Sequence, residues 1–448
     1  MAAFLLIQLG QTVSILGSSM TGFALSIWAY QLTGQATALA LVAFFNFGPT
    51  VLLSPIAGAL VDRWNRKWVM MISDLGAALG TIAIFILYSM GDLQIWHLYI
   101  VGALTGAAQA FQFPAYSAAI TMMIPKEQYG RASGLMSLAE PAASIFAPVL
   151  AGALIGSIGI GGIMIIDIIT FSAAFSALAV VRIPQPKATA EGIAARGSLL
   201  KESGFGFTYI LARPSLLGLQ LMFFYINLVG SISFTVMTPM ILARTNLDSV
   251  ALGWVFSIGS IGGLAGGLLM SAWGGPKRRV HGVLLGMAAI GVFAVIPLGL
   301  AGPVLLWAFG NFMFGLILPV LNGSNQALWQ AKVPPDLQGR VFSVRRLIAQ
   351  ITAPVGMLAA GPLADKVFEP AMQSGGWLPD TFGGIVGVGP GSGMGLMFVL
   401  AGAVGTIGAL AGYLVPVIRN AEDILPDHNV QPELQGEEAS EESAVAPA

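Results

Sequence analysis

The hydrophobic pattern of the chain consists of long apolar stretches separated by short polar segments. A helix needs about 20 mainly apolar residues to cross a membrane. With proline, glycine and charge clusters as boundaries, the pattern predicts twelve such stretches, at residues 4–30, 36–61, 68–90, 95–124, 134–157, 161–183, 214–243, 250–273, 281–301, 303–331, 342–364 and 392–418. Strand-like alternation is absent, and only helices or closed barrels can span lipid. We therefore expect an all-α integral membrane protein.

The composition supports a membrane protein and excludes several other classes. Of 448 residues, 56% are hydrophobic and only 9% are charged, whereas soluble proteins carry about a quarter charged residues. The first stretch, 4–30, is too long for a signal-peptide core, so we expect a retained span. There are no cysteines, and the three histidines lie far apart, so we expect neither disulfides nor a metal site. The net charge of −1 gives no support for nucleic-acid binding.

The basic residues indicate how the chain crosses the membrane. If the first span starts in the cytoplasm, all the lysines and arginines except Arg244 and Lys366 fall on the cytoplasmic side. Cytoplasmic loops of membrane proteins carry an excess of such residues. We therefore expect a multi-pass protein of the plasma membrane (a bacterial inner membrane), with both termini in the cytoplasm.

An internal repeat divides the chain in two. A shift of 209 residues aligns separated positions without a gap: Gly58, Leu60 and Trp64 with Gly267, Leu269 and Trp273; Pro125, Gly130 and Arg131 with Pro334, Gly339 and Arg340; and Ala151, Gly152 and Leu154 with Ala360, Gly361 and Leu363. Such duplication is typical of transporters, with a central site between the repeats. We expect six-helix halves at 1–183 and 214–418, a cytoplasmic linker at 184–213, and a disordered acidic tail at 419–448. The alternative for the tail is a regulatory docking segment.

The stretch Gly58–Lys67, GALVDRWNRK, has the pattern Gly-x-Leu-x-Asp-Arg-x-x-Arg-Lys. It resembles the signature loop between the second and third helices of the major facilitator superfamily. The phrases GQTVSILGSSMTGFALSIWAYQLTG, DRWNRKWVMMISD and VPPDLQGRVFSVRRLIAQITAP are similar to the branch that includes macrolide-efflux and enterobactin-export proteins. The resemblance implies two pseudo-symmetric six-helix bundles, a small-molecule substrate, no cofactor and transport by alternating access.

In the family that the chain resembles, the loop acts as a conformational latch. The resemblance assigns this role to Gly58, Asp62, Arg63, Arg66 and Lys67. Asp62 would lie against the positive N-terminal end of a helix in the other half, and the three basic side chains would pair with carboxylates or lipid phosphates. In the second copy, Ser271 replaces the acid. The alternative is a loop that only sets the topology, which explains the basic residues but not Asp62.

Three acidic residues lie inside expected spans, where a buried carboxylate is costly and usually functional. Glu140 and Asp74 lie in the inner parts of the fifth and third spans, and Asp167 lies in the sixth. They are candidates for proton coupling. The alternative is structural pairing, of Asp74 with Arg63 or Arg66, which we favour for that residue, or of Glu140 with a nearby arginine.

The fifth span contains small residues that resemble the antiporter motif Gly-x-x-x-Gly-Pro-x-x-Gly-Gly. The matching positions are Ala143, Ala147, Pro148, Ala151 and Gly152. Small residues at this spacing allow helices to approach closely, which is also the alternative, purely structural interpretation. The fourth-span arginine of drug–proton antiporters is absent from IVGALTGAAQAF, so the resemblance does not extend to coupling by that mechanism.

By the same resemblance, spans one, four, seven and ten line the cavity. Their polar and aromatic residues are the candidates for substrate contact: Gln8, Gln11, Gln109, Gln112, Tyr116, Tyr225, Asn227, Asn311, Asn322 and Asn325. A mostly apolar cavity with a few such groups suits an amphiphilic or uncharged organic molecule. The alternative for each residue is a hydrogen bond between helices.

The leading functional hypothesis is a secondary active exporter of hydrophobic or amphiphilic compounds, such as drugs, macrolides or siderophores. No catalytic or nucleotide-binding motif is present, so we expect neither an enzyme nor an ATP-driven pump. The expected partners are the substrate, membrane lipids and, if transport is proton-coupled, protons; we expect a monomer. The alternatives are an importer or a carrier of a specific metabolite or lipid and, in another class, a membrane sensor or scaffold.

Overall fold

The computed structural model describes residues 2–61, 64–124, 129–181, 183 and 206–427. The regular elements in these ranges are all helices, and none of them is a strand. In the first half they are α1 Ala2–Thr33, α2 Ala36–Val61, α3 Arg66–Met90, α4 Ile95–Met123 and α5 Tyr129–Val180. In the second half they are α8 Pro214–Thr235, α9 Met237–Arg244, α10 Ser249–Trp273, α11 Arg279–Ile290, η2 Gly291–Val295, α12 Ile296–Gly299, α13 Val304–Lys332, α14 Pro335–Leu363, η3 Ala364–Phe368, α15 Glu369–Met372, α16 Pro379–Val386, α17 Ser392–Ala411, η4 Gly412–Leu414, α18 Pro416–Arg419 and α19 Ala421–Ile424.

The helices account for the twelve expected spans. Ten segments of the described chain are long and apolar enough to cross a membrane. One of them, in α5, contains two spans, because Gly159 (φ 66°, ψ −179°) interrupts the helix in a conformation that glycine adopts readily. The 29-residue helix α4 supplies the remaining span. The all-α membrane fold with twelve spanning helices is therefore confirmed.

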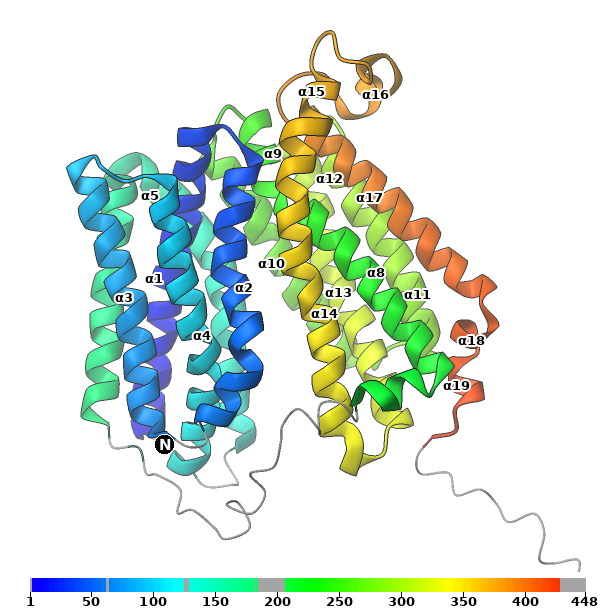
Figure 1. Cartoon of the computed structure of the whole chain (residues 1–448), viewed down its shortest axis with the longest axis horizontal. Coiled ribbons are helices and arrows are strands. Elements are labelled where there is room, and N and C mark those ends of the chain that lie inside the picture. Colours follow the sequence, from blue (N-terminus) through cyan, green and yellow to red (C-terminus); the bar gives the residue numbers. More distant parts are fainter. Residues whose placement is uncertain (1, 62–63, 125–128, 182, 184–205, 428–448) are drawn as a thin grey trace, which may run out of the picture.

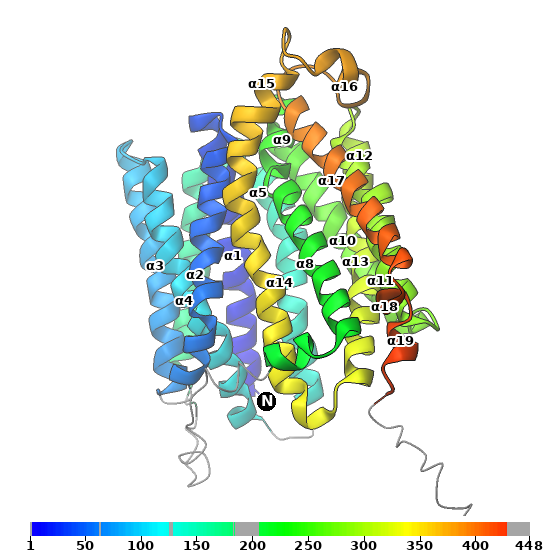
Figure 2. The same cartoon turned by 45° about the vertical axis from the view of Figure 1, so that its right-hand side comes forward.

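The two halves lie side by side (Figures 1 and 2). The N-terminus of α1 lies at one end of the bundle, together with α18 and α19, whereas α15 and α16 lie at the opposite end. We call these the N-terminal end and the α15 end.

The halves meet where α5 packs on α10 and where α2 packs on α14. Ser249 Oγ donates to the carbonyl of Gly152 (3.3 Å), and Ser257 Oγ donates to the carbonyl of Ile145 (2.6 Å). A Cβ atom added at Gly152 would lie 2.8 Å from the Ser249 carbonyl oxygen. These contacts lie toward the α15 end, since α10 begins there, and small residues allow the close approach.

The first part of the expected disordered tail is ordered, so that prediction is wrong for residues 419–427. Glu422 accepts a hydrogen bond from a backbone N–H in the first turn of α11 (3.0 Å), and Asp423 pairs with Arg278. The buried Lys332 donates to the carbonyl of Glu422 (2.6 Å) and pairs with Asp427 (2.8 Å). The acids are held because they face a helix N-terminus and the basic second copy of the signature loop. Residues 428–448 lie outside the described residues.

The expected linker, 184–213, is described only from residue 206. Residues 206–211 are helical, and Tyr209 and Ile210 are buried in the main hydrophobic core. The end of the linker therefore packs on the protein.

Candidate functional site

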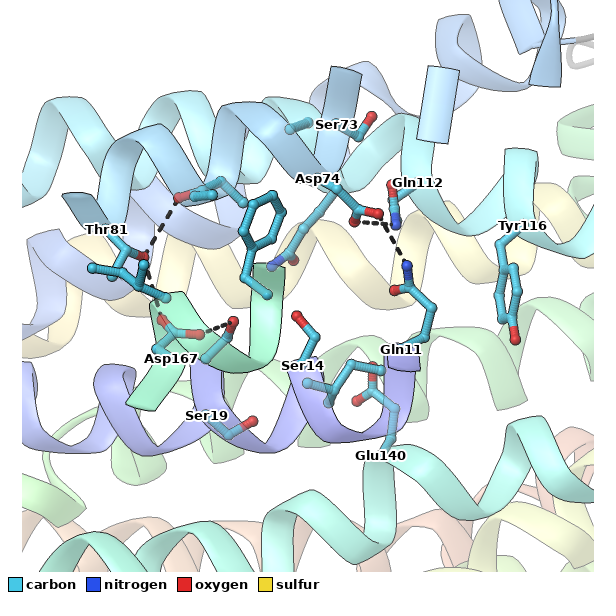
Figure 3. A pocket seen from close by; sticks show the side chains of 18 residues that line it. Gln11, Ser14, Ser19, Ser73, Asp74, Thr81, Gln112, Tyr116, Glu140 and Asp167 are labelled. Carbon is cyan, nitrogen blue, oxygen red and sulfur yellow. Dashed lines mark hydrogen bonds between the residues drawn. The ribbon is translucent and has the colours of Figure 1, made fainter. Parts of the chain in front are cut away.

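A cavity of about 440 Å³ lies within the first half, between α1, α3, α4 and α5. We call it the acidic pocket, because Asp74, Glu140 and Asp167 all line it (Figure 3). The structure thus brings together the three acids that the sequence places on three different spans. It also brings four of the expected substrate-contact residues to the same pocket: Gln11, Gln109, Gln112 and Tyr116.

Two amide side chains hold the carboxylate of Asp74. Gln11 Nε2 donates to Oδ2 (3.0 Å) from α1, and Gln112 Nε2 donates to Oδ1 (2.6 Å) from α4. These contacts, rather than the favoured pairing with Arg66, hold Asp74, and its carboxylate lies between Gln11 and Gln112 (Figure 3). Arg63 lies outside the described residues. Asp74 therefore links three helices around the pocket.

Asp167 is held by hydroxyl groups. It is 3% exposed, and its carboxylate accepts hydrogen bonds from Ser18 Oγ (2.9 Å) and Thr81 Oγ1 (3.3 Å). Neutral donors thus satisfy this buried group, and no basic side chain in the described part of the chain pairs with it.

Glu140 differs from the other two acids, since it is solvent-exposed and projects from α5 into the pocket on the side of Gln11 (Figure 3). No described side chain is within hydrogen-bond contact of its carboxylate. Gln112 Oε1 is buried and likewise has no partner among the described groups. Glu140 is therefore an exposed acceptor of this pocket that has no donor among the described side chains, which suits a proton, a cationic group or a hydrogen-bond donor of a ligand.

Tyr116 and Gln8 form a pair beside this pocket. The Tyr116 hydroxyl donates to Gln8 Oε1, and Gln8 Nε2 donates to Thr12 Oγ1 (3.3 Å). Gln8 is buried. It therefore makes a hydrogen bond between helices, which was the alternative to substrate contact for this residue.

A second cavity, of about 460 Å³, lies mainly in the second half. We call it the aromatic pocket; Phe47 of α2 reaches it from the first half, so it lies where the halves meet. Its other aromatic lining residues are Phe223, Phe234 and Phe314, and its polar ones include Asn227, Ser231, Asn322 and Gln350. An apolar wall with a few amides and hydroxyls is typical of a site for an organic molecule.

Like Gln8, three further expected substrate-contact residues line neither pocket. Asn311 Nδ2 donates to the carbonyl of Val255 (2.9 Å) and ties α13 to α10, and Tyr225 donates to the carbonyl of Val404 (2.7 Å). Asn325 is 2% exposed. Asn311 and Tyr225 therefore make hydrogen bonds between helices, which was the alternative to substrate contact.

The antiporter-like motif lies on the face of α5 that meets α10. Ala143, Ala147 and Ala151 are buried. A Cβ added at Gly253 of α10 would lie 2.6 Å from the Pro148 carbonyl oxygen. The motif thus provides a close helix contact between the halves.

The signature loop is described in part. Gly58 lies in the last turn of α2, and Arg66 begins α3, while Asp62 and Arg63 lie outside the described residues. Lys67 Nζ donates to the carbonyls of Ala179 (2.7 Å) and Val181 (2.8 Å). The partner expected for Lys67, a carboxylate or a phosphate, is therefore replaced by the carbonyl groups at the end of α5, which favour a cation there.

Several lining residues were missed by the sequence analysis. Phe47, Thr81 and Gln350 lie on the second, third and eleventh spans, which were not expected to line the cavity. For Thr81 and Gln350, a polar residue inside an apolar span was an available signal.

Comparisons with known proteins agree with this architecture. The model of the family described as "Major Facilitator Superfamily" matches residues 7–357. Macrolide efflux protein A of Streptococcus pyogenes is 28% identical over 382 residues, which cover 81% of this chain and 90% of that protein. Enterobactin exporter EntS of Salmonella typhi is 21% identical over 348 residues, covering 76% and 80%. These matches confirm the resemblance seen in the sequence motifs.

Among solved structures, the fold is similar to a bacterial homologue of the human lysosomal transporter Spinster in an inward-facing and unoccupied conformation. The TM-score is 0.66 at 15% identity, covering 93% of this chain and 97% of the other. At this identity, the likeness concerns the fold.

Proposed function

The chain belongs to the Major Facilitator Superfamily, and on that basis we propose that it is a secondary active exporter of amphiphilic organic molecules. The substrate binds between the halves and is released by alternating access. The aromatic pocket carries this proposal, because it is apolar, lies where the halves meet and has a volume of about 460 Å³, within the range of small-molecule sites. The similarity to efflux proteins supports export over import.

The acidic pocket indicates the chemistry of the substrate and which residue carries the coupled proton. The carboxylate of Glu140, which has no described partner, favours a substrate whose polar end donates hydrogen bonds or carries a positive charge. Glu140 is the candidate proton carrier, because its carboxylate has no described partner, while Asp74 and Asp167 are each held by two described donors. The donors to Asp74 and Asp167 lie in the same half as these two acids, so their contacts are retained when the halves move relative to one another.

The orientation follows from charge. The N-terminal end faces the cytoplasm, since Arg244 and Lys366 are the two basic residues expected at the opposite end. The protein then lies in a bacterial inner membrane with both termini inside, and it acts as a monomer. The signature loop with Asp62 is the latch at the cytoplasmic end.

Accumulation of candidate compounds in cells without their own pumps tests the direction of transport. We expect expression to lower the steady-state content of a cationic amphiphile such as a macrolide, and to raise resistance to it. A raised content would show an importer. An unchanged content across a panel of drugs and siderophores, at normal expression, would contradict the proposed substrate class.

A further inference from the structure

The first turn of α2 lacks a capping residue of its own. The first backbone N–H groups of a helix have no partner within the helix, and a preceding Ser, Thr, Asp or Asn usually accepts from them. Asn65 caps α3 and Asp248 caps α10 in this way. Gly34 and Gln35 precede α2, so its cap comes from elsewhere in the chain.

The cap is supplied by the other half of the protein. Asp365 lies in the π-helical turn η3, which continues α14 at the α15 end. Its Oδ1 accepts from the N–H of Ala36 (2.9 Å) and its Oδ2 from the N–H of Thr37 (2.7 Å). Both carboxylate oxygens are therefore used by a helix more than 300 residues away in sequence.

The backbones of α2 and α14 are also close at this point. Gly361 lies one turn before Asp365, and a Cβ added there would lie 2.4 Å from the Cα of Thr37. Only a glycine permits this approach, so Gly361 and Asp365 together fix the distance between the halves at the α15 end.

We propose that Asp365 is a latch that stabilises the conformation in which the α15 end is closed. The contact joins two halves that move apart at this end during alternating access, so it cannot persist once the end opens. The next acid along the helix shows the contrast. Glu369 accepts from the N–H groups of Gly391 (3.0 Å) and Met394 (2.8 Å), at the start of α17. This second cap lies within one half and is retained when the halves move.

The expected effect follows from the strength of such contacts. A carboxylate at a helix N-terminus changes an equilibrium by roughly 2- to 30-fold. Loss of Asp365 should change the ratio of α15-end-open to α15-end-closed molecules by this factor. That is enough to alter transport while the protein remains folded.

The chain contains no cysteine, so pairs of introduced cysteines can be spin-labelled specifically. The labelled full chain is reconstituted in lipid. Met90→Cys with Leu305→Cys reports the α15 end, and Val180→Cys with Leu414→Cys reports the N-terminal end; all four positions are exposed. Distances are measured without substrate, so the outcome does not depend on whether the proposed compounds are exported.

We expect Asp365→Ala to enlarge the long-distance population of the first pair and the short-distance population of the second. Asp365→Asn should give a smaller shift, because its amide oxygen still accepts one hydrogen bond. Gly361→Ala should shift both pairs in the same direction without touching the acid, and it serves if an Asp365 variant folds poorly. Asp92 is an exposed acid just after the last residue of α3. As the control, Asp92→Asn should leave both distributions unchanged.

Unchanged distributions in folded Asp365→Ala and Gly361→Ala protein would overturn the latch. Failure of export in cells, with these distance changes present, would count against the proposed substrate and leave the latch standing.

Discussion

The three acids of the acidic pocket differ in their partners. Asp74 and Asp167 each bind neutral donors from more than one helix, so both contribute to the shape of the first half. Glu140 lines the same pocket without a described partner. This difference separates structural carboxyl groups from the one proposed to carry a proton.

Replacing Glu140 by Gln should abolish the dependence of transport on the pH gradient, because the amide keeps the shape but cannot exchange a proton. Substrate uptake into inverted vesicles is measured with and without an acidic interior. Glu140→Asp, which keeps the ionisable group, should retain the stimulation by acid. If Glu140→Gln is stimulated as strongly as the wild type, the proton carrier is another residue.

Replacing Lys67 by Met should lower the stability of the protein by about 1 kcal/mol, because two carbonyl groups at the end of α5 lose their charged donor. The midpoint of thermal unfolding in detergent reports the change. Lys277 is an exposed lysine in the second copy of the loop, and Lys277→Met should leave the midpoint unchanged. Equal effects of the two variants would contradict a specific role for the Lys67 contacts.

At the scale of elements, the approach of α5 and α10 depends on Gly152. Gly152→Ala should destabilise the protein by roughly 1–3 kcal/mol, because the new Cβ would lie 2.8 Å from the Ser249 carbonyl oxygen. Gly156, one turn further along α5, has nothing within 4 Å of an added Cβ. Gly156→Ala is the matched control and should leave thermal stability unchanged; an equal loss in both variants would show a general effect of alanine.

The segment after α17 acts as a strap across the N-terminal end of the second half. Glu422→Gln combined with Asp423→Asn should lower the thermal unfolding midpoint, since the first turn of α11 and Arg278 lose their acidic partners. The magnitude is about 1 kcal/mol, as expected of an exposed ion pair and a charged helix cap. Glu437→Gln, further along the acidic tail, should have no effect. A double variant as stable as the wild type would show that the strap is not held by charge.

Most of the spanning helices could be predicted from the sequence. The length of the apolar stretches and the 209-residue repeat predicted twelve spans, because a membrane requires a minimum helix length and duplication leaves a constant offset. The strap was not predictable from composition, which made Glu422 and Asp423 look like part of a disordered acidic tail. Their partners lie on α11 and on the loop before it, over 140 residues away in sequence.

At the scale of the whole molecule, the sequence predicted which types of residue form the site better than it predicted which residues lie together. Amides and acids inside apolar spans were recognisable, but which of them share a pocket depends on how each helix is rotated. Asn311 and Tyr225 face neighbouring helices, whereas Gln350, on a span not expected to line the cavity, faces the aromatic pocket. The Asp365 contact depends on how the halves meet. Its only sequence signal was the missing cap before Ala36.

As a whole molecule, the protein is proposed to export its substrate by alternating access driven by a proton gradient. The most direct measurement is uptake of a cationic amphiphile into inverted membrane vesicles with an acidic interior, which represents the outer side of the membrane. We expect vesicles that contain the protein to accumulate the compound faster than empty vesicles, and collapse of the gradient to remove the difference. Equal uptake by both kinds of vesicle, across compounds of the proposed class, would contradict the account.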